Sequence, residues 1–250
     1  MKQKPARLRL DQLLVERGIA DSISKATAMI LSGEVLLEGR RTEKAGMQVD
    51  REAQIEIASR QQKYVSRGGV KLEGALQDFS IDPTNLVCLD IGASHGGFTD
   101  CLLQRGAARV YAVDVNVEQL DWKLRRDPRV IQIERNAREL RTADIPEPVN
   151  LVVIDVSFIS VCKVIGPAAA TAKPGATFLI LIKPQFELPR KVIARGGIVS
   201  DKELHERTIE TVSKHVQSLG LETLGVRPSR LPGAEGNLEY FLHARKSLVK

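Results

Sequence analysis

From residue 86 onward, short apolar runs alternate with amphipathic stretches along the chain. This alternation is typical of a mostly parallel β-sheet covered by helices on both faces. Ligands of such sheets bind beyond the carboxyl ends of the strands, so the residues that end the apolar runs are the candidates for chemistry. The predicted strands are residues 87–91, 110–114, 130–133, 151–155, 177–182, 221–226 and 239–244.

The first 60 residues follow a different pattern, which predicts a small α+β unit. Asp11 is placed to cap a short first helix that ends at Gly18. A second helix is expected to begin near Asp21 or Ser22 and to end at Gly33. Alternating residues after this glycine predict short strands, so a helical hairpin is followed by a small sheet.

Polar residues without periodicity occupy positions 59–66, which places a domain boundary there. The sequence therefore predicts an N-terminal domain of residues 1–60, a linker of residues 61–66 and a second domain of residues 67–250.

The composition excludes several classes of protein. Of the 250 residues, 43% are hydrophobic and 27% charged, the balance of a soluble globular protein. The three cysteines form no zinc or disulfide pattern, and no apolar run reaches the length of a membrane span. We therefore expect a cytoplasmic protein without a metal, with a monomer as the default. The net charge of +6 favours a polyanionic partner, although many proteins of this charge bind no nucleic acid.

Cations of the N-terminal segment stand at predicted helix starts and strand turns, where long side chains can reach phosphates. A solvated surface is the alternative interpretation. The order of elements decides between them, because the stretch RLDQLLVERGIADSISKATAMILSGEVLLEGRRTEKAGMQVD resembles the S-four RNA-binding domain, which grips structured RNA by shape and backbone. The predicted RNA-binding residues are Arg7, Arg9, Lys25, Arg40, Arg41 and Lys44.

A Gly-rich turn, DIGASHGGFT from Asp90, ends the first strand of the second domain, and the next strand ends at Asp114. A dinucleotide fingerprint needs G-x-G-x-x-G, whereas this turn has G-x-x-x-G-G. S-adenosylmethionine has no phosphate, but it has a cationic sulfonium and amine and two ribose hydroxyls that carboxylates can bind. The two acids therefore favour this methyl donor over NAD. A tight turn without any ligand is the plainer alternative.

Charged residues also end the fourth and fifth strands, at Asp155 and at Lys183 before Pro184. The sequence lacks the N/D-P-P-Y/F motif of enzymes that methylate base amines and the Pro-Cys setting of those that methylate carbon-5 of pyrimidines. An amine and a carboxylate beside the donor suit an oxygen nucleophile such as a ribose hydroxyl. An ordinary ion pair that caps the two strands is the alternative.

Residues 63–245 resemble the FtsJ-like ribosomal RNA 2'-O-methyltransferases, and their pairing with the S-four-like domain resembles the TlyA family. The resemblance implies a Rossmann-like class I methyltransferase sheet, S-adenosylmethionine as cofactor, and cytidine riboses in ribosomal RNA or ribosomal subunits as substrate. The stretches that carry it are SRGGVKL from Ser66, DIGASHGGFTDCLL from Asp90, YAVDV from Tyr111, WKLR from Trp122, VIDVSFIS from Val153, IKPQFE from Ile182 and EGNLEYF from Glu235.

The resemblance also implies site residues. The family's catalytic set corresponds to Lys71, Asp155, Lys183 and Glu239. In the implied mechanism Lys183 deprotonates or polarises the 2'-hydroxyl, Asp155 holds this lysine, and Lys71 with Glu239 orients the nucleotide. The implied donor-binding residues are Asp90, Gly92, Ala93, Ser94, Gly96, Gly97, Phe98, Asp114 and Asn136.

Besides the stretch around Asn136, which is one residue shorter than usual, three places depart from the family pattern: His95 in the glycine turn, residues 116–118 after the second strand, and Ala234 before Glu239. A non-catalytic RNA-binding or ribosome-assembly factor that has kept the fold is the main alternative function. Some relatives carry a haemolysin name, but a pore former needs amphipathic or spanning segments, which this sequence does not show.

Overall fold

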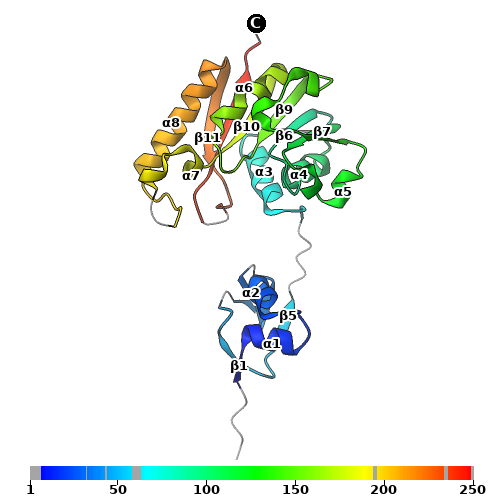
Figure 1. Cartoon of the computed structure of the whole chain (residues 1–250), viewed down its shortest axis with the longest axis vertical. Helices are drawn as coiled ribbons and strands as arrows, with labels where there is room; N and C mark the ends of the chain where they lie inside the picture. The colour runs from blue at the N-terminus through cyan, green and yellow to red at the C-terminus, as the bar shows by residue number, and fades with distance from the viewer. Residues whose placement is uncertain are drawn as a thin grey trace, which may run out of the picture. The chain divides into compact units, whose positions relative to one another are not determined.

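The computed structural model describes residues 7–31, 33–42, 44–57, 63–193, 196–233 and 236–248. The chain divides into two compact units, Met1–Gln62 and Lys63–Lys250 (Figure 1). Each unit has its own hydrophobic core, so each is described by itself.

The N-terminal unit packs two helices, α1 (Leu10–Glu16) and α2 (Ile23–Leu31), against short strands. Strand β1 (Arg7–Arg9) pairs with β4 (Gln48–Asp50), and β2 (Val35–Leu37) lies between β3 (Arg40–Arg41) and β5 (Ile55–Ile57). The helical hairpin followed by strands is as predicted. Its core is made of apolar side chains from both helices and from the strands, among them Leu10, Leu13, Leu14, Ile30, Val35 and Val49.

The prediction that Asp11 caps the first helix is wrong. The helix begins at Leu10, two residues earlier than a cap at Asp11 requires, and Arg9 occupies the cap position without a side-chain cap hydrogen bond. The carboxylate of Asp11 is buried and forms an ion pair with Arg9 at 2.6 Å, because a charged guanidinium is a stronger partner than a backbone N–H. Gly18 and Gly33 do adopt the left-handed conformation expected where the two helices end.

A seven-stranded sheet forms the centre of the second unit, in the order β11-β12-β10-β9-β6-β7-β8. Strand β12 runs antiparallel to both its neighbours, β10 and β11, and the other neighbouring pairs are parallel. All seven predicted strands are present, and the largest difference is that β10 begins five residues earlier than predicted. The strands are β6 (Val87–Ile91), β7 (Arg109–Asp114), β8 (Val130–Glu134), β9 (Val149–Ile154), β10 (Ala172–Ile182), β11 (Leu221–Pro228) and β12 (Tyr240–Lys246).

Helices cover both faces of this sheet, because alternate strand residues point to opposite faces and both sets are apolar. One core joins the sheet to α3 (Arg67–Asp78), α4 (Gly97–Gln104) and α5 (Trp122–Arg125), and the other joins it to α6 (Cys162–Thr171) and α8 (Lys202–Ser218). Short helical turns connect the strands: α7 (Pro184–Glu187), η1 (Val117–Gln119), η2 (Ala137–Glu139), η3 (Thr142–Asp144) and η4 (Arg190–Val192). No helix in the described ranges is long and apolar enough to cross a membrane.

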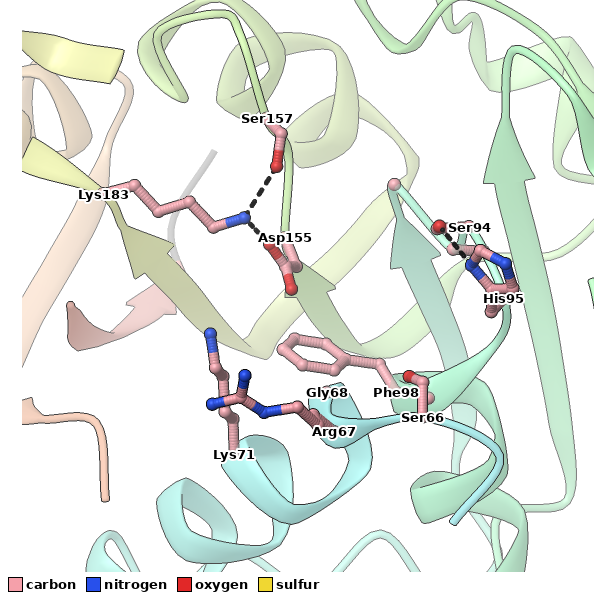
Figure 2. Close-up of a pocket in the computed structure, with 13 residues that line it drawn as sticks. Ser66, Arg67, Gly68, Lys71, Ser94, His95, Phe98, Asp155, Ser157 and Lys183 are labelled. Atoms are coloured by element: carbon pink, nitrogen blue, oxygen red, sulfur yellow. Dashed lines mark hydrogen bonds and ion pairs between the residues drawn. The ribbon is translucent and has the colours of Figure 1, made fainter. Parts of the chain in front are cut away.

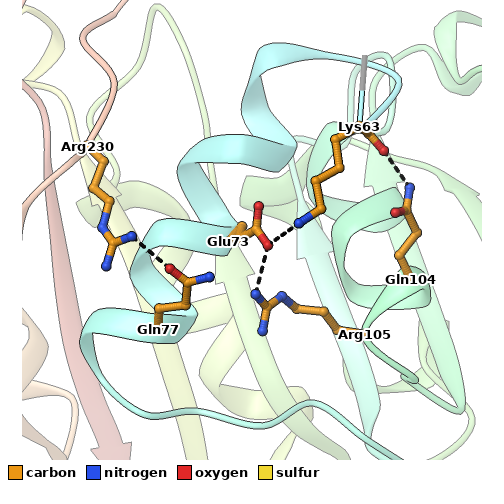
Figure 3. Close-up of polar contacts among 6 residues, drawn as sticks. All are labelled: Lys63, Glu73, Gln77, Gln104, Arg105 and Arg230. Atoms are coloured by element: carbon orange, nitrogen blue, oxygen red, sulfur yellow. Dashed lines mark hydrogen bonds and ion pairs between the residues drawn. The ribbon is translucent and has the colours of Figure 1, made fainter. Parts of the chain in front are cut away.

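Residues 63–66, which the sequence assigned to a linker, belong to the second unit, and Figure 3 shows Lys63 beside α3 and α4. Glu73 of α3 binds Lys63 at 2.5 Å and Arg105 at 2.9 Å, and Gln104 of α4 donates a hydrogen bond to the Lys63 carbonyl. The ring of Tyr64 is buried in the core beneath α3. These contacts fasten α3 to α4, and thereby fix the helix that carries Lys71.

Candidate functional site

The order of the parallel strands reverses between β6 and β9, which is where sheets of this kind open a ligand-binding crevice. Ile154 at the end of β9 lies opposite Ile91 of β6 and Ile180 of β10. The next residue, Asp155, donates its backbone N–H to the Ile91 carbonyl at 2.9 Å. Asp155 therefore stands at the mouth of the crevice.

The glycine turn crosses directly over the backbone of Asp155. Gly92 has a φ of +84°, and a Cβ atom there would lie 2.2 Å from the Asp155 carbonyl oxygen. Gly96 has a φ of +91°, and its Cβ would lie 2.2 Å from the side chain of Leu124. Only glycine fits at both positions, since the conformation and the available space each exclude a side chain. The turn is followed directly by α4, which begins at Gly97.

Lys183 and Asp155 meet in the crevice (Figure 2). The Lys183 ammonium forms an ion pair with Asp155 Oδ1 at 2.5 Å and donates a hydrogen bond to Ser157 Oγ at 2.9 Å. Because β9 and β10 are adjacent and parallel, their carboxyl ends bring these side chains to the same edge of the sheet. The Lys183 side chain is 10% exposed, so the amine is largely withdrawn from solvent while it still faces the cavity.

A second buried pair, Lys71 and Glu239, lies at the same edge, with 2.5 Å between Nζ and Oε2. Lys71 lies in the first turns of α3, and Figure 2 shows its side chain pointing toward the Lys183–Asp155 pair. Glu239 directly precedes β12, whose first residue, Tyr240, lies opposite Ile182 of β10. This antiparallel register brings Glu239 level with Lys183. The fold thus brings together all four residues of the implied catalytic set.

A cavity of about 220 Å³ opens between the two pairs and the glycine turn. Five of the predicted donor-binding residues line it: Gly92, Ala93, Ser94, Gly97 and Phe98. Four others, Asp90, Gly96, Asp114 and Asn136, do not. The lining also includes Lys71, Asp155 and Lys183, so the predicted donor and acceptor residues face one space. Across the described ranges, no group of three or more His, Cys, Asp or Glu residues could hold a metal ion.

Acidic residues around the glycine turn fit a cationic donor. Asp90 is fully buried; its Oδ2 accepts a hydrogen bond from Thr99, and its Oδ1 has no partner in the described structure. Burial, with a smaller contribution from the nearby charge of Asp155, raises the pKa of Asp90 to about 7 against the hydrogen bond from Thr99. A cationic ligand nearby would favour the ionised form of this carboxyl group.

Two predicted donor contacts lie outside the cavity, at the ends of β7 and β8. Asp114 Oδ2 accepts the backbone N–H of Ser94 at 2.9 Å, and its Oδ1 accepts that of Asn116 at 3.1 Å. The carboxylate thereby ties the glycine turn to the end of β7, and its remaining lone pairs can still accept hydroxyl groups. Asn136 caps η2 and accepts hydrogen bonds from Arg138.

Several residues that line or border the cavity were not singled out for a role from the sequence. Ser66, Arg67 and Gly68 enter it from the start of α3, and Ser157 enters it after β9. Phe158 is 87% exposed in a left-handed conformation, with its ring 5.1 Å from that of Phe186. All five lie within stretches that carried the family resemblance, and their nearness in sequence to Lys71 and Asp155 was the available signal.

The three departures from the family pattern lie around the glycine turn or outside the described residues. His95 is exposed at the turn, with its Nδ1 3.2 Å from Ser94 Oγ. Asn116 caps η1 by accepting the backbone N–H of Glu118 at 3.1 Å. Ala234 lies outside the described residues.

The predicted RNA contacts all lie on the N-terminal unit. Two of them are paired with acids, Arg9 with Asp11 and Lys25 with Asp21, each at 2.6 Å. The side chain of Arg41 lies outside the described part of the structure. Three cations are exposed and form no ion pair among the described residues: Arg7, Arg40 and Lys44.

The seven-stranded sheet with its reversed strand, and the glycine turn at its switch point, define a Rossmann-like methyltransferase. A structure of an S-adenosylmethionine-dependent methyltransferase from Listeria monocytogenes has this fold, with a TM-score of 0.55 at 15% identity over 73% of this chain and 100% of its own. Residues 64–246 match the FtsJ-like methyltransferase family, and residues 8–55 match the S4 domain. The chain belongs to the FtsJ-like methyltransferase family, in its TlyA group.

Relatives of this group cover almost the whole chain. The 16S/23S rRNA (cytidine-2'-O)-methyltransferase TlyA of Mycobacterium tuberculosis is 44% identical over 96% of this chain and 90% of its own length. A protein named Hemolysin A, from Brachyspira hyodysenteriae, is 40% identical over 94% of this chain and 99% of its own length. A structure from Streptococcus thermophilus that bears the name hemolysin has a TM-score of 0.76 at 37% identity, covering 97% of this chain and 89% of its own.

Proposed function

We propose that this protein transfers a methyl group from S-adenosylmethionine to the ribose 2'-hydroxyl of a cytidine in ribosomal RNA. The observation that carries the proposal is the Lys183–Asp155 pair, which faces the same 220 Å³ cavity as the glycine turn. When bound, the donor supplies an electrophilic methyl group on a positively charged sulfur. The names of the relatives supply the choice of cytidine.

Lys183 is the residue that we assign to the acceptor oxygen. A ribose hydroxyl is a weak nucleophile at neutral pH, so its proton must be accepted, or the developing negative charge stabilised, as the oxygen attacks. Asp155 and Ser157 hold the Lys183 amine from two sides, at 2.5 and 2.9 Å. This restraint on a flexible side chain favours one orientation of the amine toward the cavity.

Lys71 and Glu239 are assigned to positioning the nucleotide. Their buried ion pair costs desolvation and contributes little net stability, so a role in binding gives a reason for its place at the cavity. Lys71 lines the cavity and can donate to a ribose or phosphate oxygen, while Glu239 fixes the direction of the lysine.

An RNA acceptor is also consistent with the border of the cavity and with the first unit. Phe158 directly follows Ser157, which contacts Lys183, and it exposes an aromatic ring on which a single-stranded base can stack. The N-terminal unit, which matches the S4 domain over residues 8–55, supplies the exposed cations Arg7, Arg40 and Lys44 for phosphate contacts. A ribosomal substrate implies action in the cytoplasm, where ribosomes are assembled.

The test is methyl transfer from radiolabelled S-adenosylmethionine to purified ribosomal subunits, with the modified ribose mapped on the RNA. We expect label on a cytidine 2'-oxygen. Label on a base, or donor binding without transfer to either subunit, would contradict the proposal. Absence of donor binding even with subunits present would favour the non-catalytic assembly factor.

Replacement of Lys183 by alanine tests the mechanism. We expect the rate of transfer to fall by about 10²- to 10⁴-fold, the usual contribution of a general acid or base. Donor and RNA affinities, measured by calorimetry and filter binding, should change little. As a control, Lys173→Ala removes an exposed lysine outside the cavity and should leave the rate unchanged. Full activity of Lys183→Ala would refute the assigned role.

A further inference from the structure

The tryptophan of this chain is exposed, which is uncommon for so large an apolar side chain. Trp122 is the single tryptophan in the sequence, and 56% of its surface is accessible in the structure. It begins the short helix α5, which follows β7 and the turn η1. The assigned methyl-transfer machinery does not use this residue.

The helix that carries Trp122 packs against the glycine turn. Leu124 is buried and packs so closely on Gly96 that a Cβ atom there would lie 2.2 Å from it. The backbone N–H of Asp121 donates to the His95 carbonyl at 3.2 Å. The indole is therefore held at a fixed place beside the turn that is predicted to bind the donor.

Two cations lie beside the indole, and a third exposed cation belongs to the same helix. Lys123 Nζ and Arg126 Cζ lie 5.9 and 5.6 Å from the centre of the ring, and Arg125 is exposed next to them. In the described part of the chain none of the three forms an ion pair. By contrast, nearby Arg129 is bound to Asp127 at 2.7 Å. Three neighbouring positive charges without acidic partners repel one another, and an anionic ligand would relieve this repulsion.

We propose that Trp122, Lys123, Arg125 and Arg126, the indole patch, bind the RNA substrate beside the donor-binding turn. The indole stacks on an unpaired base, and the cations contact the phosphates on either side. Aromatic rings and arginine planes both stack on bases, and lysine and arginine neutralise the backbone. The proposal rests on the proposed function, and it adds an RNA contact on the methyltransferase unit to those expected on the S4 domain.

The single tryptophan allows a test on the unmodified protein. A hairpin from ribosomal RNA is titrated in, with saturation followed by filter binding, while acrylamide quenching of tryptophan fluorescence is measured. We expect the quenching constant to fall by about two-fold, since a stacked base covers one of the two faces of the ring. Saturating S-adenosylhomocysteine alone should leave it unchanged. Unchanged quenching at full RNA saturation, or equal protection by an acidic polypeptide such as polyglutamate, would overturn the proposal.

Variants of the indole patch separate the contribution of base stacking to RNA binding from that of charge. Trp122→Ala should weaken RNA binding by roughly ten-fold, whereas Trp122→Phe, which keeps a ring, should lose much less. The double variant Lys123→Ala, Arg126→Ala should lower the slope of log affinity against log salt by about 1.4 to 1.8. A matched control removes the same charge from α8, with Lys202→Ala and Lys214→Ala, whose partners are Glu206 and Glu210. Equal RNA affinity and salt slope in both double variants would overturn the proposal.

The readout is binding, so it is independent of methyl transfer. If the wild-type protein methylates ribosomal RNA while Trp122→Ala binds RNA as well as wild type, the RNA-binding role of the indole patch is wrong and the proposed function stands. If RNA protects Trp122 but no methyl group is transferred, the patch stands and the proposed function is wrong. Thermal unfolding and donor affinity, which should stay near wild-type values in every variant, confirm that each variant is folded.

Discussion

Asp90 shows how one buried carboxyl group can link folding, pH and ligand binding. Its folded-state pKa of about 7 lies well above the value near 3.9 of an unfolded chain. The folded protein therefore keeps this proton at pH values where the unfolded chain has lost it. This contribution to stability is fully present below about pH 4 and is lost as the pH rises toward 7.

Donor affinity should depend on pH through Asp90. A cationic donor favours the carboxylate, so calorimetry at pH 6 and pH 8 should show up to about ten-fold tighter binding of S-adenosylmethionine at the higher pH. Asp90→Asn should bind the donor more weakly at pH 8 and lose most of this pH dependence. The variant also serves as the control for titration of the amine of the donor itself. Parallel pH profiles in the two proteins would contradict the assignment.

Gly92 is a second position where a single residue is expected to control both stability and donor binding. Gly92→Ala combines a positive φ with a contact of 2.2 Å to the backbone of Asp155, so we expect the free energy of unfolding to fall by several kcal/mol and donor binding to be lost. Gly220→Ala is the matched control, because its φ is +74° but no atom lies within 4 Å of the added Cβ. It should cost only about 1–2 kcal/mol, and denaturant unfolding would measure both. Similar losses in the two variants would rule out the close approach as the cause.

One buried asparagine, Asn237, connects the loop before β12 to the segment before α8. Asn237 accepts the backbone N–H of Val199 at 2.9 Å and donates to the Gly197 carbonyl at 3.0 Å. Its own carbonyl accepts the N–H of Gly233, a residue that packs against the carboxylate of Glu239. The loop before β12 and the segment before α8 thus support each other beside the Lys71–Glu239 pair.

Removal of this support should disturb the site. Asn237→Ala leaves the buried N–H of Val199 and the partly buried carbonyl of Gly197 without this partner, so we expect a loss of about 2 kcal/mol in unfolding free energy and a lower rate of methyl transfer. Asn150→Ala is the control, since Asn150 accepts the N–H of Val87 at the opposite end of the sheet. The Asn150→Ala variant should be less stable than wild type, but it should keep the wild-type rate of methyl transfer at a temperature where both variants are folded. A wild-type rate of methyl transfer in Asn237→Ala would show that the position of Glu239 does not depend on this loop.

The two units of the chain have separate hydrophobic cores. The N-terminal core is built from α1, α2 and their strands alone, while the cavity draws every lining residue from the second unit. Binding of RNA by the S4 domain and binding of the donor should therefore be separable.

A chain that begins at Lys63 tests this separation. It keeps the Lys63–Glu73 pair and buried Tyr64, so the second unit should still unfold cooperatively and bind the donor with near wild-type affinity. Its affinity for ribosomal RNA should fall by about ten-fold or more, because the S4 cations are gone. Calorimetry and filter binding measure the two affinities. Unchanged RNA binding would contradict the assigned role of the S4 domain.

Some of this architecture was predictable from local sequence and some was not. Apolar runs identified all seven strands of the large sheet, and the strand ends pointed to Asp155 and Lys183. The cap at Asp11 was predicted wrongly because the competing partner, Arg9, depends on side-chain geometry. The packing of residues 63–66 on α3 and α4 was missed because a polar stretch without periodicity gives no sign of where its side chains go.

The strands, the glycine turn and the family could be predicted from the sequence alone, because alternating apolarity and glycines at fixed spacing act over a few residues. Which distant charges meet depends on how the elements pack. Lys71 and Glu239 lie 168 positions apart, and they touch only because α3 packs on α4 and β12 enters the sheet antiparallel to β10. The exposure of Trp122 was likewise set by packing, since Leu124 rather than the indole fills the space over the glycine turn.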